Sequence, residues 1–189
     1  MMRFTSKAFL ICFLLSLQTS FVIGQKKDSI LPPLLPIDEH TQLITYQYAI
    51  PMKGSAEDLY QRAYAWVKKY YKNPSQVIKK ADAENNVIEC SSSIKITTPS
   101  KDGKSFVMAG LVYYNLKIET RPDRYRYTIT DFNLRGASNL PIEIWLDQSR
   151  KDWIPIRFEH LRQVDEGVKA LMENLETGME PEEEINDDW

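Results

Sequence analysis

Two segments with the periodicity of amphipathic helices enclose a run of segments that alternate like β-strands, and one further strand precedes them. The helical patterns cover about residues 56–72 and 156–177. The strand-like segments cover residues 42–50, 76–80, 87–97, 105–120 and 125–132. This β-α-β-β-β-β-α order predicts an α+β fold, because helices segregated from antiparallel strands pack together on the sheet. We expect a curved antiparallel sheet with two helices packed on one face, in a single domain over residues 42–178.

The first 24 residues have the pattern of a secretory signal peptide. A positively charged start precedes an apolar stretch over residues 8–20, and small residues then suit cleavage before Gln25. The stretch is too short for a typical membrane span, so an uncleaved anchor is the weaker alternative. Ile11, rather than a small residue, precedes Cys12, which argues against a lipoprotein. We predict an exported protein, periplasmic or secreted, with no transmembrane segment after cleavage.

The regions that flank the predicted domain differ from it in composition. Residues 25–41 contain Pro32, Pro33 and Pro36, and they predict an extended linker. Residues 179–189 are strongly acidic and predict a disordered tail.

The charge and the cysteine content argue against a nucleic-acid-binding protein and against a disulfide-stabilised one. Removal of two cations with the signal peptide would change the formal net charge from −2 to −4, which argues against nucleic-acid partners. Cys90 would then be the only cysteine, so no intramolecular disulfide could form. Its place in an alternating apolar segment predicts that it is buried.

The segment 105–120 is too long for one straight strand, and Ala109-Gly110 in its middle predicts a bulge or bend. Alternation places Phe106 and Met108 on one face with the apolar residues at 112, 114, 116 and 118. The second face is also apolar over 107–113, which is unusual when helices cover one side only. Three alternatives remain for what covers this second face: the segment 134–156, a protein partner or second copy, or a small apolar ligand. The candidate binding surface comprises Val107, Leu111, Tyr113, Trp145 and Trp153.

A basic cluster lies near the end of the first predicted helix, beside a tyrosine. Lysine next to tyrosine suits an anionic glycan or lipid headgroup, whereas the simpler interpretation is a solvated helix face. The candidate anionic-ligand patch comprises Lys68, Lys69, Tyr71 and Lys72.

The sequence contains no recognisable catalytic or metal-binding motif. His40 and His160 each lack a second ligand at metal-binding spacing. Gly103-Lys104-Ser105 lacks the earlier glycine of a phosphate-binding loop and joins two strands instead of opening a helix. We therefore predict no catalytic, metal-binding or cofactor-binding residues and no cofactor.

A specific resemblance is carried by the stretch YQYAIPMKGS at residues 46–55, with EDLY at 57–60, AWV at 65–67 and YRYTITD at 125–131. These segments resemble an uncharacterised family of exported Bacteroidota proteins, described as a domain of unknown function with a TBP-like fold. The resemblance covers about residues 42–133. It implies a curved TBP-like sheet and a Gram-negative envelope setting, and it brings no catalytic residues.

Taken together, these features favour an exported, non-catalytic binding or interaction module of the bacterial envelope. The alternative is an envelope or extracellular hydrolase, which would need residues such as Asp131, Glu143 and His160 to converge in a pocket. Nucleic-acid binding is suggested only by the fold's name, and a fold does not by itself define a function.

Overall fold

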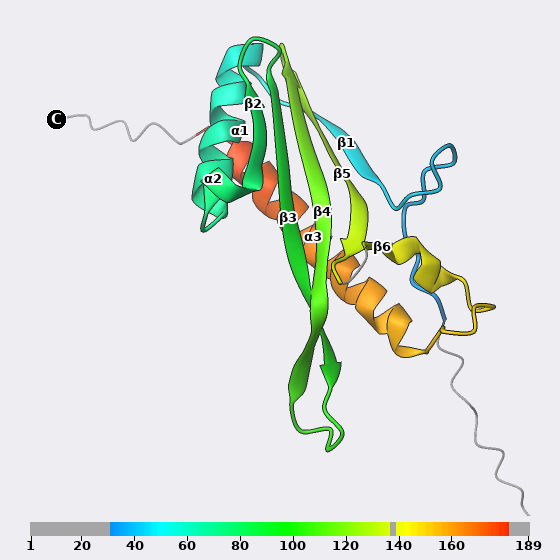
Figure 1. Ribbon diagram of the computed structural model, residues 1–189. Helices are drawn as coiled ribbons and strands as arrows, with labels where there is room; N and C mark the ends of the chain where they lie inside the picture. Colours follow the sequence, from blue (N-terminus) through cyan, green and yellow to red (C-terminus); the bar gives the residue numbers. More distant parts are fainter. Residues whose placement is uncertain (1–30, 137–138, 182–189) are drawn as a thin grey trace, which may run out of the picture.

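A computed structural model describes residues 31–136 and 139–181 of the 189-residue chain (Figure 1). The predicted signal peptide and most of the predicted acidic tail lie outside these residues. The strands are β1 (Tyr46–Pro51), β2 (Ile78–Asp82), β3 (Val87–Pro99), β4 (Phe106–Arg121), β5 (Arg124–Leu134) and β6 (Leu140–Pro141). The helices are α1 (Ala56–Tyr70), the one-turn α2 (Pro74–Val77), the 3-10 helix η1 (Ile142–Leu146) and α3 (Ile156–Met179).

The strands form one antiparallel sheet in the order β1-β5-β4-β3-β2, and β6 adds to β5. Helices α1 and α3 pack against the same face, and α3 crosses behind the strands at an angle (Figure 1). The architecture confirms the predicted α+β fold with helices on one face of the sheet. The predicted strand at 76–80 lies two residues later, at Ile78–Asp82, because Pro74 starts a helical turn that lasts to Val77.

Local sequence explains where α1 begins. The hydroxyl of Ser55 accepts a hydrogen bond from the backbone N–H of Asp58 at 3.0 Å, and the Asp58 carboxylate accepts one from the Ser55 N–H at 3.2 Å. This reciprocal capping box satisfies two amides that the first helical turn leaves free. Ser55 is therefore the N-cap of α1.

The core lies between the two helices and the sheet. It is built from the apolar stripes of α1 and α3 and from alternate residues of β3, β4 and β5. Cys90 is 2% exposed, which confirms its predicted burial. The largest fully buried side chains include Tyr125, Tyr127, Phe132 and Phe158.

The bulge predicted in the long strand is confirmed. Ile96 pairs with Gly110 and Thr97 pairs with Met108, so Ala109 is one extra residue on β4. Gly110 has a φ of +158°, and a side-chain Cβ there would lie 2.7 Å from Cδ1 of Leu134. Glycine at this position therefore allows both the bend and the close approach of Leu134.

The segment that precedes β1 contacts the domain. Ile37 forms an isolated antiparallel bridge with Ile44, and Leu35 packs against the core. Gln42 has a φ of 60°, which reverses the chain before β1 and explains why the strand begins at Tyr46 and not at 42. Within residues 31–136 and 139–181, no helix is long and apolar enough to cross a membrane.

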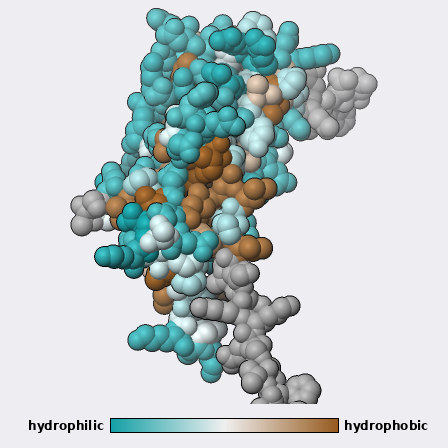
Figure 2. Space-filling model, turned by 90° about the vertical axis from the view of Figure 1, so that its right-hand side faces the viewer, coloured by the Kyte–Doolittle hydropathy of each residue, from teal (hydrophilic) through white to brown (hydrophobic). Residues whose placement is uncertain are grey.

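Apolar side chains also reach the surface on the side of the molecule where β6 and η1 lie in Figure 1. Figure 2 shows them gathered around the middle of that side, bordered by hydrophilic residues. Leu140 in β6 and Ile154 before α3 are among the exposed apolar residues of the domain.

Candidate functional site

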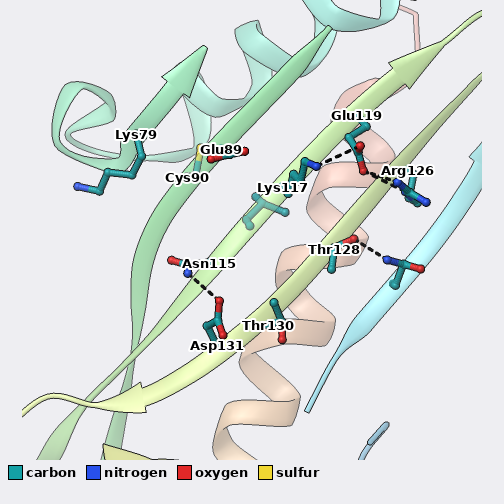
Figure 3. Close-up of a pocket in the computed structure, with 12 residues that line it drawn as sticks. Lys79, Glu89, Cys90, Asn115, Lys117, Glu119, Arg126, Thr128, Thr130 and Asp131 are labelled. Carbon is teal, nitrogen blue, oxygen red and sulfur yellow. Dashed lines mark hydrogen bonds and ion pairs between the residues drawn. The ribbon is translucent and has the colours of Figure 1, made fainter. Parts of the chain in front are cut away.

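The face of the sheet that turns away from α1 and α3 is polar along its centre, and we refer to it as the open face. Figure 3 shows part of it, with α3 visible behind the strands. Its polarity follows from strand alternation, because every second residue of three adjacent strands points away from the core. The open face is formed by Glu89, Ser91 and Ser93 on β3, Tyr113, Asn115, Lys117 and Glu119 on β4, and Arg126, Thr128 and Thr130 on β5.

A cavity of about 570 Å³ lies on this face over β3, β4 and β5. At one end Glu119 accepts hydrogen bonds from Arg126 at 2.6 Å and 3.0 Å and pairs with Lys117 at 3.2 Å. Partial burial would raise the pKa of Glu119, but the bonds from Arg126 and Lys117 outweigh it and hold that pKa below its usual value. The carboxylate is thus ionised and neutralised by its neighbours, which makes it a poor proton donor.

The middle of the cavity is shaped by a second irregularity, in β5. Tyr113 pairs with Asn133 and Asn115 pairs with Thr130, so β5 carries one more residue than β4 between these pairs. Asp131 has a φ of 59° there, and its carboxylate accepts a 3.0 Å hydrogen bond from the Asn115 amide (Figure 3). A left-handed conformation at a non-glycine residue is uncommon and costly. The bulge directs Asp131 onto the open face.

A second cavity of about 670 Å³ adjoins the first, and Lys79, Asn115 and Asp131 line both. Its other lining residues are mainly uncharged hydrogen-bonding residues: Gln76, Ser91, Ser92, Ser93, Asn133 and Asn139. Because the two cavities share three residues, they form one continuous groove, which we refer to as the open-face groove.

The side chains of Tyr113 and Arg135 form one wall of this groove. The Arg135 guanidinium lies 5.0 Å from the centre of the Tyr113 ring and donates a 3.2 Å hydrogen bond to its hydroxyl. The Arg135 backbone N–H also bonds the carbonyl of Leu111 at 3.2 Å. The cation–π contact and these two bonds hold the aromatic ring in place at the end of β5.

The structure separates the members of the predicted apolar surface. Leu111 and Tyr113 are half-buried beside Arg135 on the open face, but the extra residue Ala109 reverses the alternation beyond it. Val107 pairs with Thr98, which faces α3, and so it lies on the helix side. Phe106 and Met108 lie on the open-face side, opposite to the face that strict alternation predicts.

The two tryptophans of that predicted surface lie elsewhere. Trp145 is buried against α3, where the Arg157 guanidinium lies 4.7 Å from its ring centre. Trp153 stacks edge-on to Phe158 and donates a 2.8 Å hydrogen bond to the Trp145 carbonyl. The two tryptophans therefore do not cover the second face of the long strand, which was one of the three alternatives. Arg135 lies against Tyr113 on that face instead, whereas Leu134 packs beside Gly110 on the helix side.

The predicted anionic-ligand patch is not formed as a unit. Lys68, Lys69 and Lys72 are exposed, and the Lys68 ammonium lies 5.4 Å from the Tyr64 ring centre. Tyr71 is only 8% exposed and belongs to the core. Tyr71 directly follows the last residue of α1 and has an extended backbone conformation, which turns its side chain inward.

The three groups that a hydrolase would need do not converge. Asp131 lies on the open face, whereas a Glu143 oxygen accepts a 2.9 Å hydrogen bond from the Ile44 N–H. His160 is buried on α3, with Nε2 2.9 Å from the Thr98 hydroxyl and its ring against Trp145. No group of metal-ligating side chains is present among the described residues.

The sheet and its two helices define the class of α+β proteins with a TBP-like fold. Residues 46–135 match the model of the family described as "Domain of unknown function (DUF4468) with TBP-like fold". No curated protein matches the chain significantly.

Two solved structures share the fold. A DUF4468 family protein from Bacteroides ovatus ATCC 8483 is 12% identical, with a TM-score of 0.61 over 78% of this chain and 92% of the other. A TBP-like protein from Parabacteroides distasonis ATCC 8503 is also 12% identical, with a TM-score of 0.60 over 76% of this chain and 96% of the other. These likenesses concern the fold, and neither description names a ligand.

Most residues of the open-face groove were not predicted as a site. Ser91 and Ser93 were assigned to a strand, and Asn133 and Arg135 received no role. The signal was nevertheless in the sequence, because three neighbouring strands carry polar residues at every second position. Tyr113 is the one predicted surface residue that lines the groove.

Proposed function

We propose that the protein is an exported, non-catalytic binding module of the bacterial envelope that holds a carbohydrate in the open-face groove. The observation that carries this proposal is the continuity of the two cavities across β3, β4 and β5. Each has a volume within the range of about 300–1,000 Å³ that is typical of small-molecule sites. A continuous groove of this kind suits a ligand that extends over several sugar units.

The chemistry of the lining favours a ligand rich in hydroxyl groups. Serine hydroxyls and asparagine and glutamine amides both donate and accept hydrogen bonds, as sugar hydroxyls do. The Asn133 side-chain nitrogen donates to the Asp131 carbonyl, so the side-chain oxygen is the atom with which Asn133 would accept a hydrogen bond from a sugar hydroxyl. Charges in the groove are of both signs, and Glu119 is already neutralised by Arg126 and Lys117. A strongly anionic or cationic ligand would therefore gain little electrostatic binding free energy in this groove.

The arrangement of acids and bases supports a non-catalytic role. Sugar hydrolysis commonly uses two carboxyl groups that face each other, one of them protonated. In the groove, Glu119 is held ionised by its two cations, and Asp131 is bonded to Asn115. The environment of Glu119 therefore does not favour the protonated form that a general acid needs near neutral pH.

Isothermal titration calorimetry with chito-, cello- and xylo-oligosaccharides tests the proposal. We expect at least one series to bind, and Asn115→Ala and Tyr113→Ala each to weaken binding about fivefold, since loss of one good contact costs about 1 kcal/mol. Lys69→Ala, on the far side of the sheet, is the matched control and should bind as the unmodified protein does.

Two results would contradict this function. Binding of short peptides but of no saccharide would exclude the proposed ligand class, and full binding by both groove variants would exclude the site. Export is tested separately, by N-terminal sequencing of the protein recovered outside the cytoplasm. A chain that starts at Gln25 supports export, and an intact chain retained in the cytoplasm contradicts it.

A further inference from the structure

The hairpin of β3 and β4 extends beyond the rest of the sheet, and Figure 1 shows it protruding below the body as a two-stranded ribbon. The pairing of β2 with β3 ends at Cys90, and the pairing of β5 with β4 ends at Val112. Beyond these points, the outer edges of both strands have no strand partner among the described residues. We refer to the outer part, residues 95–110 including the turn, as the arm.

The β4 side of the arm is apolar and accessible. Phe106, Val107 and Met108 are 72%, 52% and 57% exposed. The extra residue Ala109 reverses the alternation of side chains, so Phe106 and Met108 lie on one side of the ribbon and Val107 on the other. Each side of the β4 strand of the arm therefore carries an apolar residue. An exposed strand with free backbone groups and apolar side chains is a template for pairing with another strand.

The two edges of the arm differ in how they are protected. On β3, Lys95 is exposed and Pro99 lacks an amide donor, and both features discourage edge pairing. On β4, residues 105–116 include neither a charged residue nor a proline. The β4 edge is therefore the one that can accept a further strand.

We propose that the free β4 edge of the arm, residues 106–110, pairs antiparallel with the same edge of a second copy. Antiparallel pairing about a two-fold axis sets each segment against itself, so every cross-strand neighbour of Phe106, Val107 and Met108 is uncharged. The same pairing on β3 would bring Lys95 towards its own counterpart. Because the arm protrudes, antiparallel arms place the two bodies at opposite ends.

The proposed interface is small. Three side chains and a short backbone ladder fall short of the area of about 800 Å² per partner that is typical of a stable interface. We therefore expect a weak dimer that dissociates on dilution.

Sedimentation-velocity ultracentrifugation over a concentration series tests the inference. The expected result is a monomer that converts to a dimer as concentration rises. Val107→Lys should raise the dissociation constant about tenfold or more, because it places a charge at the pairing edge. Ile154→Lys, an equally exposed apolar residue away from the arm, is the matched control and should leave association unchanged.

Cysteine cross-linking gives a second readout that needs no charged variant. Two-fold pairing of residues 106–110 sets Met108 opposite its own copy, so Met108→Cys should form a disulfide-linked dimer under mild oxidation, and Lys95→Cys on the opposite edge should not. A protein that stays monomeric at millimolar concentration, a dimer that survives Val107→Lys, or equal cross-linking at the two positions would overturn the proposal.

Discussion

The hydroxyl oxygens of Tyr71 and Tyr114 lie 3.1 Å apart inside the core, where the end of α1 meets the middle of β4. Burial raises the pKa of both phenols, so both keep their protons and one donates to the other. The pair fixes the helix end to the sheet. It also explains why Tyr71 does not stand beside the exposed lysines that precede it.

Removal of this bond should destabilise the fold. Tyr71→Phe deletes one hydroxyl and leaves the other buried, and we expect the free energy of unfolding to fall by about 1–2 kcal/mol in urea titrations. Tyr48→Phe, on an exposed tyrosine of β1, is the control and should change stability by less than about 0.5 kcal/mol. Equal losses in the two variants would contradict a specific role for the core pair.

The Cys90 thiol should be unreactive in the folded protein. Burial raises its pKa to about 12, despite the nearby Lys79 charge, so almost no thiolate exists at pH 8. In a Cys12→Ser background, we expect a thiol-specific disulfide reagent to react about a hundredfold more slowly before unfolding than in urea. Rapid reaction under native conditions would show that β3 opens at Cys90.

Acid should weaken the fold through His160. Burial, helped by the nearby Arg157 charge, lowers its folded pKa below the ordinary value of 6.5. The unfolded chain therefore takes up the proton at a higher pH than the folded chain, and stability falls as pH drops below about 6.5. Chemical unfolding at pH 7.5 and pH 5 should show a larger loss for the unmodified protein than for His160→Gln. Equal losses would mean that His160 titrates normally.

The contact between α1 and α3 depends on a glycine. A Cβ on Gly178 would overlap Cδ1 of Trp66, whose indole N–H donates a 2.9 Å hydrogen bond to Asn174. Gly178→Ala should destabilise the protein by about 1–3 kcal/mol, although alanine is the better helix former. Trp66 fluorescence should shift as the indole moves. Thr177→Ala, at the exposed neighbouring position, should be nearly neutral. A stabilised Gly178→Ala would show that the two helices separate freely.

The sequence predicted the order of elements well, because each signal was local. Ser55 caps α1 through residues only three positions away, and the bulge at Ala109-Gly110 followed from strand length and glycine. The consequence of the bulge was missed. One extra residue reverses the alternation, so Phe106 and Met108 moved to the other face although the bulge itself was expected.

The candidate site was harder to predict, because it depends on which strands become neighbours. The groove brings together β3, β4 and β5, and residues such as Ser93 and Asn133 lie 40 positions apart in the chain. The bulge at Asp131 carries no glycine or proline signal. Trp145 and Trp153 were assigned to the apolar binding surface as part of the segment 134–156, but the 3-10 helix η1 turns Trp145 onto α3.

Chemical-shift mapping by NMR tests the central claim most directly, using the oligosaccharide that binds best in calorimetry. We predict that amide shifts concentrate at residues 91–93, 113–117 and 130–135, on the open face. Shifts confined to α1, α3 or the arm, or no saccharide-dependent shifts at all, would contradict a carbohydrate site in the open-face groove.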